Sequence, residues 1–294
     1  MLSSLNNANF PSVAMSWLKI KTNTMRRNLE VTHLRIRNFF SRTAASGSIP
    51  VIVSITSHGT RVEHLWITLE SIARGAARPA KIFVWLDSAL QDEKVSVQLE
   101  RLRTRGVECV FVKDLGPHTK YYYAAIFASK SGLPVVTADD DCIYPPWWLQ
   151  RLHDAALTTP DCIVCYRARL LEFLDGATPK AYNDWPLVSF NHVEPRVFFT
   201  GVSGVWYPLC FLRAIEEAGL AFLECCPKAD DVWLNYVAAK GRFPARQVDP
   251  ISWDFAQVPM TQNIALWTEN QEGGNDAQIR RTYDCKTLEN LSKV

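Results

Sequence analysis

The 294-residue sequence lacks several features that define special classes of protein. No apolar run reaches about 18 residues, so no membrane-spanning helix is expected. With 13 glycines and 16 prolines, the chain is neither collagen-like nor of low complexity. Its net charge of +2 does not indicate nucleic-acid binding, and we expect no nucleic-acid partner. The start of the chain has no apolar segment followed by a small-residue cleavage site, so no signal peptide is expected.

Disulfide bonds are not expected either, although the sequence has eight cysteines. Without a secretion signal, the thiols are expected to be reduced, as in cytoplasmic proteins. Cys162 and Cys165 form the only C-x-x-C motif, and no second pair has the spacing of a zinc site. The sequence therefore predicts a cytoplasmic protein without a disulfide framework or a zinc centre.

The charge that is present is unevenly distributed. Residues 1–50 carry seven basic residues and one acid, or +6, whereas the remainder carries 25 basic and 29 acidic residues, or −4. We expect a basic helical amino-terminal arm over residues 1–48, with one or two helices within 15–43 and a small-residue linker at 43–48. Such an arm either binds a polyanion or an anionic membrane surface, on the inner face of the membrane, or is a solvated helix or tail.

From residue 49 onward, short β-branched runs alternate with segments of helical periodicity. The expected strands are 50–55, 81–86, 107–112, 133–137 and 161–166, and the expected helices are 62–73, 92–103, 120–130, 145–157, 209–218 and 231–239. This alternation predicts an α/β fold with a mostly parallel sheet flanked by helices. We assign residues 49–255 to this domain, with 167–205 rich in loops, and 256–294 to a closing flap or a loosely ordered tail.

Three consecutive carboxylates, Asp139, Asp140 and Asp141, directly follow the expected strand at 133–137. In open α/β sheets, ligands bind beyond the carboxyl ends of the strands. Alternation along an extended chain sends Asp139 and Asp141 to one side and Asp140 to the other. Two carboxylates on one side suit Mn²⁺ or Mg²⁺, completed by phosphate oxygens and water. The alternative is a polar turn that caps the following helix.

A second acidic pair, Asp230 and Asp231, opens the expected helix near residue 231. One aspartate is enough to cap a helix, because its carboxylate accepts hydrogen bonds from the first backbone N–H groups. The other could face a cleft and act as a general base. The spacing alone leaves both interpretations open.

Five motifs follow one another between about residues 50 and 245. They comprise an opening region (51–57 with Arg61, 69–72 and 79–86), then 114–120, 138–145, 201–208 and 229–234. In this order they resemble a family 2-like glycosyltransferase of the bacterial polysaccharide type. That resemblance implies the GT-A fold, which is Rossmann-like, a nucleoside-diphosphate sugar donor and a glycan or lipid-linked acceptor.

The resemblance also implies roles for the matching residues. Residues near the nucleotide would be Thr56, Arg61, Asp87, Lys120, Asp139 and Asp140, with Asp87 at the base or ribose and Lys120 at the diphosphate. Asp139 and Asp141 would hold Mn²⁺ or Mg²⁺, with Asp141 as the direct ligand. Asp231 would deprotonate the acceptor hydroxyl, with Asp230 as its rival. Configuration at the anomeric carbon would then invert.

Further candidates would face the donor sugar or the acceptor. Residues 201–204, including Gly204, would bring the backbone close to it, and Trp185 and Trp206 lie in loop-rich motif regions where rings could stack on sugars. Some GT-A enzymes use a late histidine as a metal ligand, but no histidine lies beyond His192 here. Two alternatives stand beside this function. One is a nucleotidyltransferase, although loop 56–61 has only one glycine. The other is a non-catalytic membrane-associated protein.

Overall fold

The computed structural model describes residues 10–259 and 274–293. The chain divides into two compact units, Met1–Ser41 and Arg42–Val294. In the first unit, helix α1 spans Phe10–Phe40, and its side chains are described from residue 24 onward. Among the described helices, none combines the length and the apolar character needed to cross a membrane.

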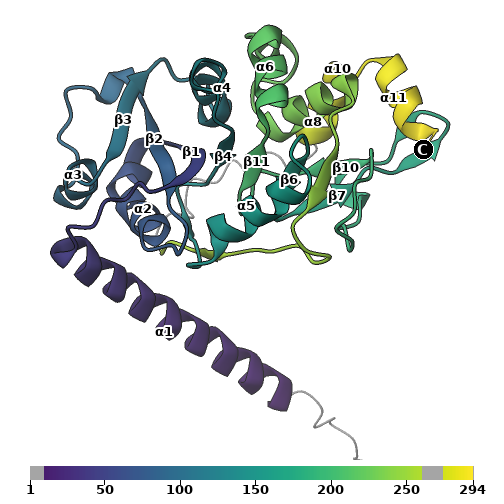
Figure 1. The fold of residues 1–294 in the computed structure, drawn as a ribbon. Coiled ribbons are helices and arrows are strands. Elements are labelled where there is room, and N and C mark those ends of the chain that lie inside the picture. The colour runs from purple at the N-terminus through teal and green to yellow at the C-terminus, as the bar shows by residue number, and fades with distance from the viewer. Residues whose placement is uncertain (1–9, 260–273, 294) are drawn as a thin grey trace, which may run out of the picture. The chain divides into compact units, whose positions relative to one another are not determined.

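The second unit is built on a seven-stranded sheet in the order β12-β6-β11-β4-β1-β2-β3 (Figure 1). Neighbouring strands are parallel, except that β11 runs antiparallel to both β4 and β6. This mostly parallel sheet confirms the predicted α/β class. Its strands are β1 (Ile49–Ser57), β2 (Pro79–Asp87), β3 (Val107–Val112), β4 (Val135–Thr137), β6 (Ile163–Cys165), β11 (Val205–Tyr207) and β12 (Ala245–Gln247).

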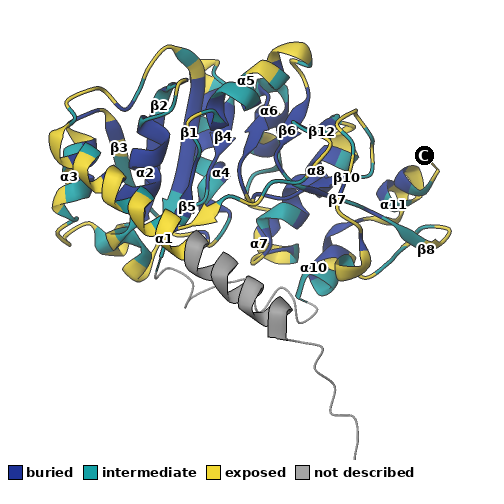
Figure 2. Cartoon of the chain, turned by 90° about the horizontal axis from the view of Figure 1, so that it is seen from below, coloured by how far each residue is buried: buried dark blue, intermediate teal, exposed yellow. Residues whose placement is uncertain are grey.

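Helices cover both faces of this sheet. Helix α4 packs on β1, β2 and β4, and α6 and α8 continue its layer, whereas α2 and α5 lie on the opposite face (Figures 1 and 2). The helices are α2 (Leu65–Ala73), α3 (Val97–Arg103), α4 (Thr119–Ser131), α5 (Trp148–Thr158), α6 (Leu209–Ala218), α7 (Phe222–Cys225), α8 (Asp230–Gly241), α10 (Asn275–Thr282) and α11 (Cys285–Ser292), with 3-10 turns η1 (Gly59–Glu63), η2 (Ser88–Leu90) and η3 (Tyr182–Asp184).

The sheet is buried on both faces, as a parallel sheet between helices must be. Successive residues of a strand point to opposite faces. In β1, Ile52 belongs to the core cluster that contains residues of α4, α6 and α8. In β11, Val205 and Tyr207 join that same cluster, whereas Trp206 packs near His153 of α5. The sheet therefore separates two apolar layers.

Three helix starts differ from the sequence prediction. Helix α2 begins at Leu65 and not at residue 62, because residues 59–63 form the 3-10 turn η1. Helix α3 begins at Val97 and not at residue 92, because the Ser96 hydroxyl caps it by accepting a 3.2 Å hydrogen bond from Leu99 N–H. Helix α5 begins at Trp148, after the two prolines at 145–146. Local periodicity places a helix well but defines its first turn poorly.

The segment expected to be loop-rich, 167–205, contains several short strands. Besides the start of β11, it holds β7 (Ala168–Leu170), β8 (Phe173–Asp175), β9 (Thr178–Pro179) and β10 (Val197–Phe199), and β7 pairs antiparallel with β10. A separate pair joins β5 (Cys142–Ile143) to β13 (Ala256–Gln257). Strands of two or three residues leave almost no periodicity to detect in a sequence.

The carboxyl-terminal segment is partly folded into the second unit. Helices α10 and α11 pack on α8, where the rings of Tyr236 and Tyr283 lie 5.4 Å apart and the Tyr236 hydroxyl donates to Asp284. Ile279 and Leu291 belong to the core cluster. Residues 260–273 of the expected flap or tail lie outside the described residues.

Candidate functional site

The sheet topology brings the two acidic segments to one edge. Strands β1, β2 and β4 are parallel and end together, and Asp139–Asp141 follow β4 directly. Strand β11 is reversed, with Val205 opposite Thr137, so the backbone of 201–204 reaches this same edge. Gly201 N–H donates a 2.8 Å hydrogen bond to Asp231 Oδ1 in the first turn of α8. The reversed strand thus links the second acidic pair to the first acidic segment.

Asp139 and Asp141 lie on one side of the acidic segment. Their carboxylate oxygens and Cys142 Sγ all lie within 4.8 Å of one another. Lys120 Nζ, from the first turn of α4, forms a 2.6 Å ion pair with Asp139 Oδ1. Asp139 N–H donates to the Tyr144 hydroxyl at 2.8 Å, which holds the segment in place. The two carboxylates form a small, partly exposed group of hard oxygen ligands.

Asp140 points into the protein and has different partners. Its side chain accepts a 2.6 Å hydrogen bond from the Ser57 hydroxyl and a 2.8 Å ion pair from Arg61. Its backbone carbonyl accepts from Thr68 on α2. Arg61 also pairs with Asp141, so one guanidinium spans two of the three carboxylates. Asp140 therefore anchors the segment, whereas Asp139 and Asp141 are less buried and each pairs with one cation.

The charges of this segment affect its protonation. Burial raises the pKa of Asp141 to about 6, and nearby Asp139 adds to this, whereas Arg61 opposes it. Burial also raises the pKa of the Cys142 thiol well above its usual value, so the thiol stays neutral. Burial disfavours a charge on Lys120, but Asp139, Asp230 and Asp231 together outweigh this, and the pKa of the ammonium rises. The site therefore holds three carboxyl groups beside two cations, Lys120 and Arg61, and one neutral thiol.

Asp231 lies across Lys120 from this segment. A Cβ atom at Gly201 would stand 3.2 Å from Asp231 Oδ1 and 3.4 Å from Lys120 Nζ, so Gly201, Asp231 and Lys120 meet at one point. Burial raises the pKa of Asp231, and the adjacent Asp230 carboxylate adds to this, whereas Lys120 opposes it. Lys120 thus lies between the carboxylates of the first acidic segment and those of the second.

Two other expected nucleotide residues lie at the same edge with local partners. Thr56, near the end of β1, donates its hydroxyl hydrogen to the Trp85 carbonyl at 3.1 Å. Asp87 ends β2, and its carboxylate caps η2 by accepting from Ala89 N–H at 3.0 Å. Each residue lies at or near the carboxyl end of its strand, and this places it at the edge of the sheet.

The structure buries two of the expected sugar-contacting residues, Trp185 and Trp206, and packs the third, Gly204, against an indole ring. Trp185 is 1% exposed and packs against Tyr182 and Phe198 in the core. Trp206 is buried on the α5 face of the sheet, opposite α8. A Cβ atom at Gly204 (φ +104°) would lie 2.8 Å from the Trp148 ring, so this glycine is required by that contact. Burial leaves neither indole with a face open to a sugar.

Three residues that shape the site received no role from the sequence. They are Ser57, which holds Asp140, Tyr144, which holds the Asp139 backbone, and Cys142, which lies beside the two outer carboxylates. Ser57 ends β1, which pairs with β4, and only this position could have indicated from the sequence that Ser57 lies at the site. The other two stand next to the acidic triplet, but their side-chain directions depend on the turn.

No protein-family model matches the chain, and no curated protein matches it by sequence. Several solved structures resemble it in fold. A mannosyltransferase from Pyrobaculum calidifontis, in complex with GDP-Man and Mn²⁺, is 13% identical, with a TM-score of 0.48 over 95% of this chain and 79% of that one. TarS from S. aureus is 12% identical, with a TM-score of 0.44 over 79% and 71%. A CMP:2-keto-3-deoxy-manno-octonic acid synthetase complexed with CTP is 11% identical, with a TM-score of 0.44 over 76% and 100%.

Proposed function

We propose that this protein is a metal-dependent glycosyltransferase that transfers a sugar from a nucleoside-diphosphate sugar to a hydroxyl acceptor. The observation that carries this proposal is the meeting of two acidic segments at Lys120. Lys120 pairs with Asp139 at 2.6 Å and lies beside the Gly201–Asp231 hydrogen bond. The arrangement offers a place for a diphosphate and, next to it, a carboxylate that can take a proton.

The carboxylates fit a hard divalent cation. Asp139 and Asp141 would hold Mn²⁺ or Mg²⁺, since oxygen ligands suit these ions. Cys142 would stay outside the ligand set, because burial keeps the pKa of its thiol high and a neutral thiol is a poor ligand for a hard cation. When bound, such an ion stabilises negative charge on the departing diphosphate.

Lys120 and Arg61 would contact the phosphates. Both cations are tied to carboxylates in the structure, Lys120 to Asp139 and Arg61 to Asp140 and Asp141. A diphosphate would share these cations and offset their charge in the same way. Thr56 and Asp87, at the ends of β1 and β2, would lie toward the nucleoside.

Asp231 would act as the general base. A carboxylate with a raised pKa is a stronger proton acceptor than an exposed one, and the Gly201 N–H fixes its orientation. It would take the proton of the acceptor hydroxyl while that oxygen attacks the anomeric carbon, opposite the leaving group. Single displacement of this kind inverts the configuration, and a retained product would contradict it.

Binding and turnover test the proposal separately. Thermal unfolding is measured with UDP, GDP, CDP and dTDP, each with and without Mn²⁺, for the wild type and Asp141→Ala. A ligand that binds only the native state raises the melting temperature. We expect one nucleotide to give a metal-dependent shift that Asp141→Ala abolishes. No shift with any nucleotide, in the presence of metal, would count against the proposal.

We also propose that α1 binds an anionic membrane surface, where lipid-linked acceptors are found. Its large exposed side chains are Met25, Leu29, Ile36, Phe39 and Phe40. At about 100° per residue they fall within an arc of roughly 100°, and the arginines of this stretch lie outside that arc. An apolar stripe flanked by arginines is the pattern of an interfacial helix.

Sedimentation with vesicles of phosphatidylglycerol and phosphatidylcholine tests this second proposal. We expect the wild type to bind in a salt-sensitive manner and Leu29→Ser/Ile36→Ser to bind more weakly. The matched control is Leu157→Ser/Leu174→Ser, which removes two exposed leucines from the second unit. Equal loss in both double variants would overturn a specific role for α1.

A further inference from the structure

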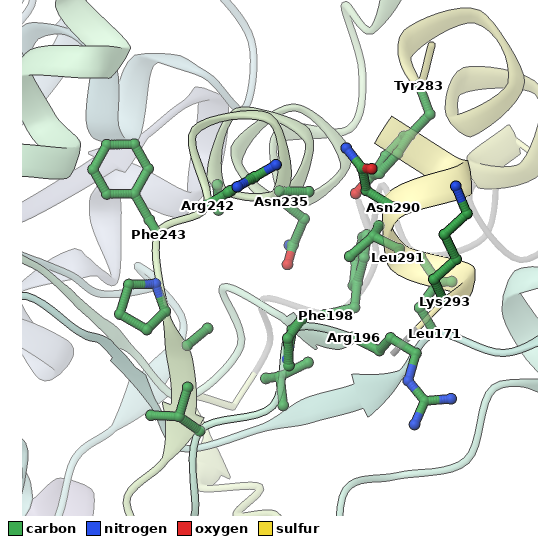
Figure 3. A pocket seen from close by; sticks show the side chains of 17 residues that line it. Leu171, Arg196, Phe198, Asn235, Arg242, Phe243, Tyr283, Asn290, Leu291 and Lys293 are labelled. Atoms are coloured by element: carbon green, nitrogen blue, oxygen red, sulfur yellow. The ribbon is translucent and has the colours of Figure 1, made fainter. Parts of the chain in front are cut away.

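A second cavity lies apart from the acidic site and shares none of the residues assigned to it. It has a volume of about 500 Å³ and lies between the second half of α8, β10, β12 and α11 (Figure 3). This volume is within the roughly 300–1,000 Å³ range of pockets that enclose small molecules. Its walls come from segments far apart in the sequence, so it exists only in the folded second unit.

The walls of this cavity are mainly apolar. Leu171, Phe198, Phe243 and Leu291 line it, together with alanines and valines of the same elements. Phe198 and Leu291 are themselves nearly inaccessible to solvent and belong to the core cluster. Because these side chains are fixed by the core behind them, the cavity is a preformed apolar surface and not a gap between mobile chains.

The charged residues at the cavity are all of one sign. Arg196, Arg242 and Lys293 line it, and its lining includes no aspartate or glutamate. Arg196 pairs with Glu194 through Nε, and within residues 10–259 and 274–293 neither Arg242 nor Lys293 forms an ion pair. In Figure 3, Arg196 and Lys293 both lie beyond Leu171 and Leu291, with the charged end of Lys293 directed upward and that of Arg196 directed downward in the view. An apolar chamber with cations at its rim complements a ligand with an apolar body and an anionic end.

Arg242 occupies an unusual backbone position for its residue type. It caps the carboxyl end of α8 with φ of 57°, in the left-handed region. Glycine or asparagine is favoured at such a position, because a larger side chain is disfavoured there. The backbone turn alone does not explain why an arginine occupies this position. A role for its positive charge at the cavity would explain it.

We propose that this cavity binds a single-chain amphiphile with an anionic head group. The apolar chain would lie against Phe198, Phe243 and Leu291, and the head group would lie at the rim, where Arg196, Arg242 and Lys293 supply positive charge. No bond is made or broken in this site. The proposal is independent of the glycosyltransferase proposal, because none of these residues contributes to the acidic site.

Isothermal titration calorimetry on the full chain tests the proposal, with dodecyl phosphate below its micelle concentration as the probe. We expect saturable one-to-one binding. Inorganic phosphate tests the head group alone, and dodecyl maltoside tests the chain with an uncharged head. Both should bind at least about tenfold more weakly, because each satisfies only half of the site. Equal affinity for inorganic phosphate would overturn the role of the apolar walls.

Two variants separate the charged rim from the apolar chamber. Arg242→Gln/Lys293→Gln should weaken dodecyl phosphate about fivefold to tenfold, since each is an exposed, screened charge. Its matched control, Arg213→Gln/Lys286→Gln, has the same net charge and alters exposed residues outside the lining, so it should bind as the wild type does. Ala239→Leu fills part of the chamber with another good helix former and should weaken binding of the probe further.

Circular dichroism and the melting temperature establish that each variant is folded, and the metal-dependent nucleotide shift reports on the acidic site. Loss of dodecyl phosphate binding in Ala239→Leu, with the nucleotide shift retained, would support the proposal. Wild-type affinity for dodecyl phosphate in both the charge variant and Ala239→Leu would overturn it, whatever the outcome for nucleotides.

Discussion

The two acidic segments at the carboxyl edge of the sheet are built from the same residue type but are held in opposite ways. Asp140 in the first segment is surrounded by side-chain partners, Ser57 and Arg61, and its charge is compensated. Asp231 in the second has a backbone N–H from Gly201 and a like-charged neighbour, Asp230. The difference shows that one residue type can serve as an anchor where it is neutralised and as a proton acceptor where it is not.

The largest expected effect comes from removing the proton acceptor. Asp231→Asn keeps an oxygen for the Gly201 N–H but cannot take a proton, so turnover should fall by about 10²–10⁴-fold. Nucleotide binding, measured by thermal shift with Mn²⁺, should persist. Asp230→Asn serves as the control and should retain most of the turnover. A larger loss in Asp230→Asn than in Asp231→Asn would assign the base to Asp230.

The next effect concerns the anchor. Asp140→Ala leaves the Ser57 hydroxyl without its acceptor and Arg61 with Asp141 alone, which should lower the free energy of unfolding by about 1–3 kcal/mol. Urea unfolding measures this loss. Asp141→Ala, at a more exposed carboxylate that accepts no hydrogen bond from Ser57, should cost less. Equal losses would mean that the triplet does not divide into an anchor and ligands.

A smaller effect is expected on metal binding. Asp141→Asn removes one of the two proposed ligand carboxylates. The Mn²⁺ concentration that gives half of the nucleotide shift should rise by about 10–100-fold. Titration of Mn²⁺ at a fixed nucleotide concentration measures it. Asp87→Asn, at a carboxylate that caps η2, should leave the metal dependence unchanged.

The smallest effect is a shift in pH dependence. Burial and Asp230 raise the pKa of Asp231, so the active, deprotonated form accumulates only as the pH rises through that raised value. Asp230→Asn removes one cause of the raised pKa of Asp231. The rising limb of kcat/KM against pH should therefore move to lower pH, by about one unit or less. A limb that stays in place would show that Asp230 does not act on the base.

The sequence predicted one half of the sheet better than the other. Strands β1, β2 and β3, six to nine residues long, lie where the β-branched runs indicate, and α4 and α6 follow from helical periodicity. By contrast, β11 and β12 have three residues each, and β11 is inserted between β4 and β6 against their direction. The equally short β4 and β6 lie in apolar runs that the sequence marks as strands, whereas β11 and β12 depend on their neighbours for their placement.

The sequence by itself determined the α/β class, the position of the acidic triplet after a buried strand, and the alternation that separates Asp140 from its neighbours. These depend on local order along the chain. Only the tertiary structure decided that Gly201 holds Asp231, that Lys120 lies between the two acidic segments, and that Trp185 and Trp206 are buried. Those contacts join residues more than fifteen positions apart or depend on which face of the sheet a side chain occupies. The reversed strand β11 determines the contacts of Gly201, because its pairing with β4 carries residues 201–204 to the carboxyl edge of the sheet.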